Sequence, residues 1–211
     1  MDLTNEWFYY TAAIDKKTCN KIKNLGKDNF KAAKIDKNCN ETTAEERKTG
    51  RVKDVGEDKK NRVSHTSWTN EQWVIDLIWP YMLKANEKSG WNFDIVAVEP
   101  IQITKYETGG FYSWHIDGGS DCLSVYDKPG NKFLHGNVRK LSMTILLNGN
   151  YQGGDFQFSN YSKLQAKVET PDFKSSGSVM VFPSFLEHSV APVTKGTRYS
   201  LVAWFLGPPF K

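Results

Sequence analysis

The second half of the chain is divided into short runs of β-forming residues, and this texture limits the folds open to it. From about residue 94, runs rich in branched and aromatic side chains alternate with turn formers: DIVAVEPIQITKYE, RKLSMTILLN, DFQFS, GSVMVFPSF and RYSLVAWFLG. The segment NGNYQGG, with Gly153 and Gly154 at its end, is a turn between two of them. Many short strands at this spacing predict a sandwich, jelly roll or barrel.

Residues 1–93 have a different texture, polar and mainly helical. The stretch IDKKTCNKIKNLGK predicts a helix with Asp15 as N-cap and Gly26 as its stop. A second helix is predicted in TNEQWVIDLIWPYMLKANEKSG, where Thr69 and Gln72 fit a capping box. Its apolar stripe consists of Val74, Leu77, Ile78, Tyr81 and Met82.

The two halves are expected to form one compact unit. In this interpretation residues 1–93 are a helical and charged-loop region that supports a β domain over residues 94–211. Within the first region, residues 31–62 are dense in charge and poor in large apolar side chains, which predicts a long loop. That loop is either a solvated connection or a lid over a substrate.

Bulk composition sets limits without identifying a function. At 211 residues the chain fits one domain with a sizeable core. The three cysteines show neither CxxC spacing nor clustering with histidines, which argues against disulfides or structural zinc and favours a reduced setting. No signal-peptide pattern or membrane span is present, so we predict a cytoplasmic protein without a membrane partner. A net charge of +4 does not indicate a partner.

A candidate metal site stands out in YETGGFYSWHIDGGSDC, where His115 and Asp117 are separated by one residue. In a strand, such residues project on the same face, about 6.5 to 7 Å apart along the backbone. His188, which follows the apolar strand SVMVF, is the candidate third ligand. Two imidazoles and one carboxylate are the ligand set of non-haem iron(II) oxygenases. His65 and His135 lack a carboxylate at strand spacing and are interpreted as surface or loop residues.

Four quoted segments together carry a family resemblance. They are QITKYETGGFYSWHID, RKLSMTILLN, GGDFQF and HSVAPVTKGTRYSLVAWF, and with them the chain resembles the iron(II)- and 2-oxoglutarate-dependent dioxygenases. Within that family it is most similar to the prolyl 4-hydroxylase-like, or PKHD-type, group. The resemblance covers about residues 96–207. It implies an α+β fold with a mainly β core, a double-stranded β-helix (jelly roll, cupin-like) with N-terminal helices packed on it.

The resemblance also implies roles for individual residues. His115, Asp117 and His188 would hold iron(II). Arg198 would pair with the distal carboxylate of the cosubstrate 2-oxoglutarate, which Tyr106 and Thr144 would also contact. Leu146 stands where animal oxygen-sensing prolyl hydroxylases carry a tyrosine. The residues expected to line the pocket are Tyr112, Leu146, Phe156, Val190 and Trp204.

The activity implied by the resemblance is hydroxylation of a prolyl residue in a peptide or protein. The cofactor is Fe(II), the cosubstrates are 2-oxoglutarate and O2, the coproducts are succinate and CO2, and ascorbate would serve as reductant. The same chemistry on a free amino acid or another small molecule is an open alternative. A nucleic-acid demethylase is less expected, because relatives of that kind carry a second arginine where this chain has Trp204. A non-catalytic cupin-like binding module is least expected, because all three metal ligands and Arg198 are present.

Overall fold

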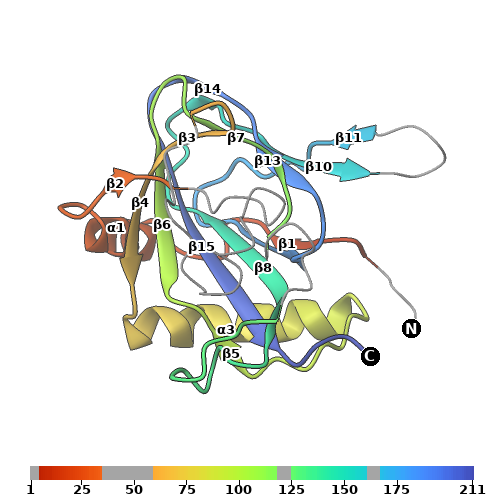
Figure 1. Ribbon diagram of the computed structural model, residues 1–211. Coiled ribbons are helices and arrows are strands. Elements are labelled where there is room, and N and C mark those ends of the chain that lie inside the picture. The colour runs from red at the N-terminus through yellow and green to blue at the C-terminus, as the bar shows by residue number, and fades with distance from the viewer. Residues whose placement is uncertain (1–4, 35–58, 118–124, 161–166) are drawn as a thin grey trace.

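The computed structural model describes residues 5–34, 59–117, 125–160 and 167–211. Its described elements are two helices, α1 (Lys16–Leu25) and α3 (Gln72–Lys88), and fifteen strands in three antiparallel sheets (Figure 1). No helix in these ranges is long and apolar enough to cross a membrane.

The larger of the two main sheets has eight strands. Seven follow the order β1-β12-β8-β15-β6-β4-β2, and β5 pairs with β15 beside them. Their bounds are β1 (Phe8–Tyr10), β12 (Val179–Pro183), β8 (Val138–Leu146), β15 (Arg198–Gly207), β6 (Ile101–Tyr106), β4 (His65–Thr69), β2 (Lys31–Ala32) and β5 (Ala97–Val98).

The smaller sheet has five strands in the order β11-β10-β13-β7-β3. Their bounds are β11 (Lys167–Glu169), β10 (Phe156–Asn160), β13 (His188–Val190), β7 (Phe111–His115) and β3 (Arg62–Val63). A short pair, β14 (Val193–Lys195) and β9 (Gln152–Gly153), forms the third sheet. The predicted jelly-roll core with few helices is confirmed.

The two faces of the large sheet bury different cores, as the alternation of side chains in β8 requires. Leu141, Met143 and Ile145 point to the face covered by the helices, where they join the stripe of α3 and Ile22 of α1. In Figure 1 both helices lie beside the large sheet, away from the small sheet at the top. The other face supplies Leu146 to an aromatic cluster that includes residues of the small sheet.

The predicted start of the first helix is confirmed, and the predicted start of the second is wrong. Asp15 caps α1 as expected, since its Oδ1 accepts the backbone N–H of Thr18 at 2.9 Å. The capping box of the second helix is wrong, because Glu71 is the N-cap of α3 and makes no side-chain cap bond. Thr69 ends strand β4 instead, and its hydroxyl accepts the N–H of Glu71 at 3.3 Å.

The prediction that residues 1–93 are mainly helical and loop missed four short strands. β1, β2 and β4 extend the large sheet, and β3 forms the edge of the small one. The predicted loop or lid over residues 31–62 begins with β2 and ends with β3, while residues 35–58 lie outside the described part.

A substitution at Gly177 tests the contact between the turn before β12 and Ile14, which precedes α1. Gly177 has φ +81°, and a Cβ built there would overlap the carbonyl of Ile14. The backbone N–H of Ile14 also donates to the Gly177 carbonyl at 3.0 Å. Gly177→Ala should lower the free energy of unfolding in urea by about 3 kcal/mol, from left-handed strain plus overpacking. Gly136→Ala is the control: its φ is +78° but nothing lies within 4 Å, so it should lose only about 1 kcal/mol. Equal losses would contradict the packing argument.

Candidate active site

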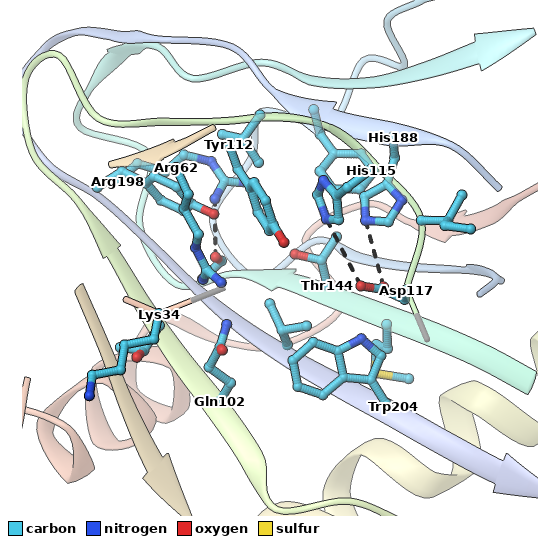
Figure 2. A pocket seen from close by; sticks show the side chains of 18 of the residues that line it. Lys34, Arg62, Gln102, Tyr112, His115, Asp117, Thr144, His188, Arg198 and Trp204 are labelled. Atoms are coloured by element: carbon cyan, nitrogen blue, oxygen red, sulfur yellow. Dashed lines mark hydrogen bonds and ion pairs between the residues drawn. The ribbon is translucent and has the colours of Figure 1, made fainter. Parts of the chain in front are cut away.

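The structure brings His115, Asp117 and His188 together between the two main sheets. His115 ends β7 and His188 begins β13, and the two are cross-strand partners. One donor atom from each of the three residues lies within 4.8 Å of the others. Nε2 of His115 is 3.9 Å from Oδ1 of Asp117, and Nε2 of His188 is 3.6 Å from Oδ2 (Figure 2).

Backbone carbonyls orient both imidazoles. Nδ1 of His115 lies 2.7 Å from the carbonyl oxygen of Ser113, and Nδ1 of His188 lies 2.8 Å from that of Leu186. A carbonyl oxygen only accepts, so Nδ1 carries the proton in each ring. An imidazole that is neutral and protonated at Nδ1 has its lone pair on Nε2, the atom that faces Asp117 in both rings and that can bind a metal.

Asp117 is held by Ser142 of β8 and by Ser184, which follows β12. Its backbone N–H donates to the carbonyl of Ser184 at 2.9 Å, and its Oδ2 accepts the hydroxyl of Ser142 at 2.7 Å. The hydroxyls of Ser142 and Ser184 are themselves 2.9 Å apart. Hydrogen bonds of this kind fix the direction of a metal-ligating carboxylate.

The protonation states suit a cation. Burial and the neighbouring His188 lower the pKa of His115 to about 3, so the ring is neutral at pH 7. Burial by itself would raise the pKa of Asp117, but His188, His115, Arg139 and the Ser142 hydrogen bond together lower it. Two imidazoles and one ionised carboxylate are a donor set that fits iron(II).

Arg198 lies at the other end of the same pocket and is 1% exposed. Its Nη1 donates to Ser200 at 3.0 Å, and its guanidinium lies 5.4 Å from the ring of its cross-strand partner Tyr106. Within the described residues, its Nε has no hydrogen-bond partner. A buried guanidinium with an unused donor fits a ligand carboxylate, such as the distal one of 2-oxoglutarate.

The pocket that joins these groups has a volume of about 1080 Å³. Six of the residues expected in the pocket do line it: Tyr106, Thr144, Tyr112, Phe156, Val190 and Trp204. Leu146 does not. It is fully buried in the aromatic cluster, on the pocket side of β8 but covered by its neighbours there.

Sequence reasoning missed two arginines that line this pocket, Arg62 and Arg139. Arg139 makes two hydrogen bonds to Glu99, at 2.6 and 2.7 Å, and its guanidinium lies 4.1 Å from the ring of Trp204. Tyr126 donates to the same carboxylate at 2.8 Å. Arg139 opens the predicted strand RKLSMTILLN, a signal too weak to select it, and Arg62 had no such signal because β3 was not predicted.

Comparison with solved structures shows a shared fold. A prolyl-4-hydroxylase from Pseudomonas putida matches with a TM-score of 0.63 and 16% identity, covering 96% of this chain and 92% of that one. A prolyl hydroxylase from Trichoplax adhaerens, in complex with a peptide fragment of the hypoxia inducible factor oxygen degradation domain, matches with a TM-score of 0.65 and 16% identity, covering 96% and 84%.

Curated relatives are PKHD-type hydroxylases. One from Synechococcus sp. (strain CC9902) is 31% identical over 51% of this chain and 41% of its own length. One from Gloeothece citriformis (strain PCC 7424) is 32% identical over 51% and 42%. The chain thus spans less than half the length of these relatives. The family model of the 2OG-Fe(II) oxygenase superfamily matches residues 101–206, half of the chain and the part that carries the triad and Arg198. The chain belongs to the 2OG-Fe(II) oxygenase superfamily.

Proposed function

We propose that this oxygenase hydroxylates a prolyl residue of a peptide or protein and converts 2-oxoglutarate to succinate and CO2. The observation that carries the proposal is the size of the pocket. A volume of about 1080 Å³ is at the upper end of small-molecule pockets, so it leaves room for a second substrate beside the cosubstrate.

Different residues of the pocket would bind the metal and the cosubstrate. His115, Asp117 and His188 would hold Fe(II), which when bound supplies the redox chemistry that couples decarboxylation to hydroxylation. Arg198 would bind the distal carboxylate of 2-oxoglutarate, with Tyr106 and Thr144 beside it. Ascorbate would serve as the reductant that keeps the iron ferrous.

Aromatic side chains make walls suited to an extended peptide. Trp68 and Trp114 are partly exposed pocket residues, and Trp68 lies 6.0 Å from Trp204 between ring centres. Proline-rich peptides keep a preset extended backbone and dock in aromatic grooves at low entropic cost. The indole N–H of Trp204 is buried and has no partner among the described residues, which leaves one donor unsatisfied at this wall of the pocket.

The solved relatives support the same substrate class. The Trichoplax adhaerens enzyme binds a peptide, and the Pseudomonas putida enzyme is a prolyl-4-hydroxylase. At 16% identity they share the fold with this chain, so the substrate is a proposal that needs its own test.

The metal site is tested by His188→Ala. Loss of one of three protein ligands should reduce iron(II) bound after anaerobic reconstitution from one ion per chain to a trace. His135→Ala is the matched control, because His135 is exposed and pairs with Asp127 at 3.6 Å outside the pocket. Undiminished iron content in His188→Ala would rule out this ligand set.

The cosubstrate site is tested by Arg198→Leu. This change should leave iron binding nearly intact and weaken 2-oxoglutarate binding by about 2 to 5 kcal/mol, the cost of truncating one partner of a buried charge pair. Calorimetric titration measures it, with the exposed Lys195→Leu as the control. Unchanged affinity in Arg198→Leu would mean that the distal carboxylate binds elsewhere.

The substrate class is tested by mass spectrometry on proline-rich peptides supplied with iron(II), 2-oxoglutarate and O2. A prolyl hydroxylase should add one oxygen, about 16 Da, to a proline ring and raise succinate production above the level without peptide. If free amino acids or methylated oligonucleotides support coupled turnover and peptides do not, the prolyl assignment is wrong. The assignment of the iron site would be unaffected by that result.

A further inference from the structure

Arg62 is a pocket arginine to which the proposed reaction gives no role. It lies on β3 opposite Tyr112 of β7 and is 8% exposed. Its Nε donates to the hydroxyl of Ser64 at 2.8 Å, and its guanidinium lies 4.5 Å from the ring centre of Tyr112. These two contacts fix the position of the cation.

The guanidinium is placed relative to the metal ligands through a stack of rings. Tyr112 packs on the imidazole of His115 at 3.5 Å between ring centres, nearly parallel at 14°. Figure 2 shows Arg62, Tyr112 and the two histidines along one side of the pocket, with Gln102 and Trp204 opposite. Because the guanidinium packs against Tyr112 and Nε is used by Ser64, its Nη donors are those left for a ligand.

The charges around the pocket leave Arg62 without a carboxylate. Arg139 is paired with Glu99, and Arg198 is assigned to 2-oxoglutarate. Asp117 would bind the metal, and Glu187, which also lines the pocket, does not lie within ion-pair distance of Arg62. In the part of the chain that the structure describes, no carboxylate lies within ion-pair distance of Arg62. A cation that is largely buried with no counter-charge is costly unless a ligand supplies one.

We propose that Arg62 binds a carboxylate of the substrate that is hydroxylated, so that the enzyme selects an acidic group close to its target proline. The inference rests on the proposed function and names its substrate class more narrowly. Carboxylates match the two parallel donors of a guanidinium better than a peptide carbonyl does. Lys31 and Lys34 line the same pocket from β2 and the residues after it, and their positive charge adds to the attraction of an anion.

The experiment compares matched peptides under anaerobic conditions, with iron(II) and 2-oxoglutarate bound and no turnover. Each proline peptide is made with Glu or Gln, and with Asp or Asn, at the positions flanking proline. N-acetylproline is compared with N-acetylprolinamide in the same way. Tryptophan fluorescence reports binding, since Trp68, Trp114 and Trp204 line the pocket. At least one carboxylate member should bind the wild-type chain about tenfold more tightly than its amide partner.

Arg62→Gln should abolish that preference while 2-oxoglutarate affinity and iron content stay unchanged. Lys195→Gln makes the same change in net charge outside the pocket and should keep the preference. Equal binding of acid and amide by the wild type, or a preference that survives in Arg62→Gln, would overturn the inference.

Loss of 2-oxoglutarate affinity in Arg62→Gln would also overturn the inference, because it would assign Arg62 to the cosubstrate. Hydroxylation of peptides without an acid preference contradicts the role of Arg62 and leaves the prolyl function standing. Absence of both hydroxylation and peptide binding contradicts both.

Discussion

The antiparallel pairing of β7 with β13 is the interaction on which the site depends. It places His115 opposite His188, residues far apart in sequence, at a distance that two ligands of one ion can share. The large sheet then provides what the pair lacks. Ser142 on β8 fixes the carboxylate of Asp117, and Arg198 on β15 closes the far end of the pocket. Neither sheet alone contains the whole site.

Strand alternation explains what could be predicted from the sequence. His115 and Asp117 project together because they are two residues apart, and Ser142 and Thr144 face the site for the same reason. The apolar stripe of α3 was readable because its spacing is helical, and Val74, Ile78 and Met82 are fully buried. Regular periodicity is visible in a single sequence.

Irregularities in the strands explain what was missed. The pairing of β8 with β15 shifts register between Phe205 and Leu206, which leaves Lys140 as an extra residue in β8. A shift of one residue exchanges the two faces, so Arg139 reaches the pocket while strict alternation assigns it to the helix side. A second shift between β7 and β13 allows Tyr112 and His115, three residues apart, to stack. No glycine or proline marks either register shift in the sequence. Strands of two or three residues, such as β3, are too short to show a hydrophobic period.

The orientation of the two imidazoles by backbone carbonyls has a consequence for metal selectivity. Because Ser113 and Leu186 hold both Nδ1 protons and Ser142 holds the carboxylate of Asp117, the three donor atoms are gathered before any ion arrives. Such a site gains affinity for every divalent first-row ion, and the Irving–Williams order favours cobalt, nickel, copper and zinc over ferrous iron at nitrogen and oxygen donors. If the triad holds the metal as proposed, correct loading of this protein would depend on which metals the cell makes available, and those ions would act as competitors of iron(II).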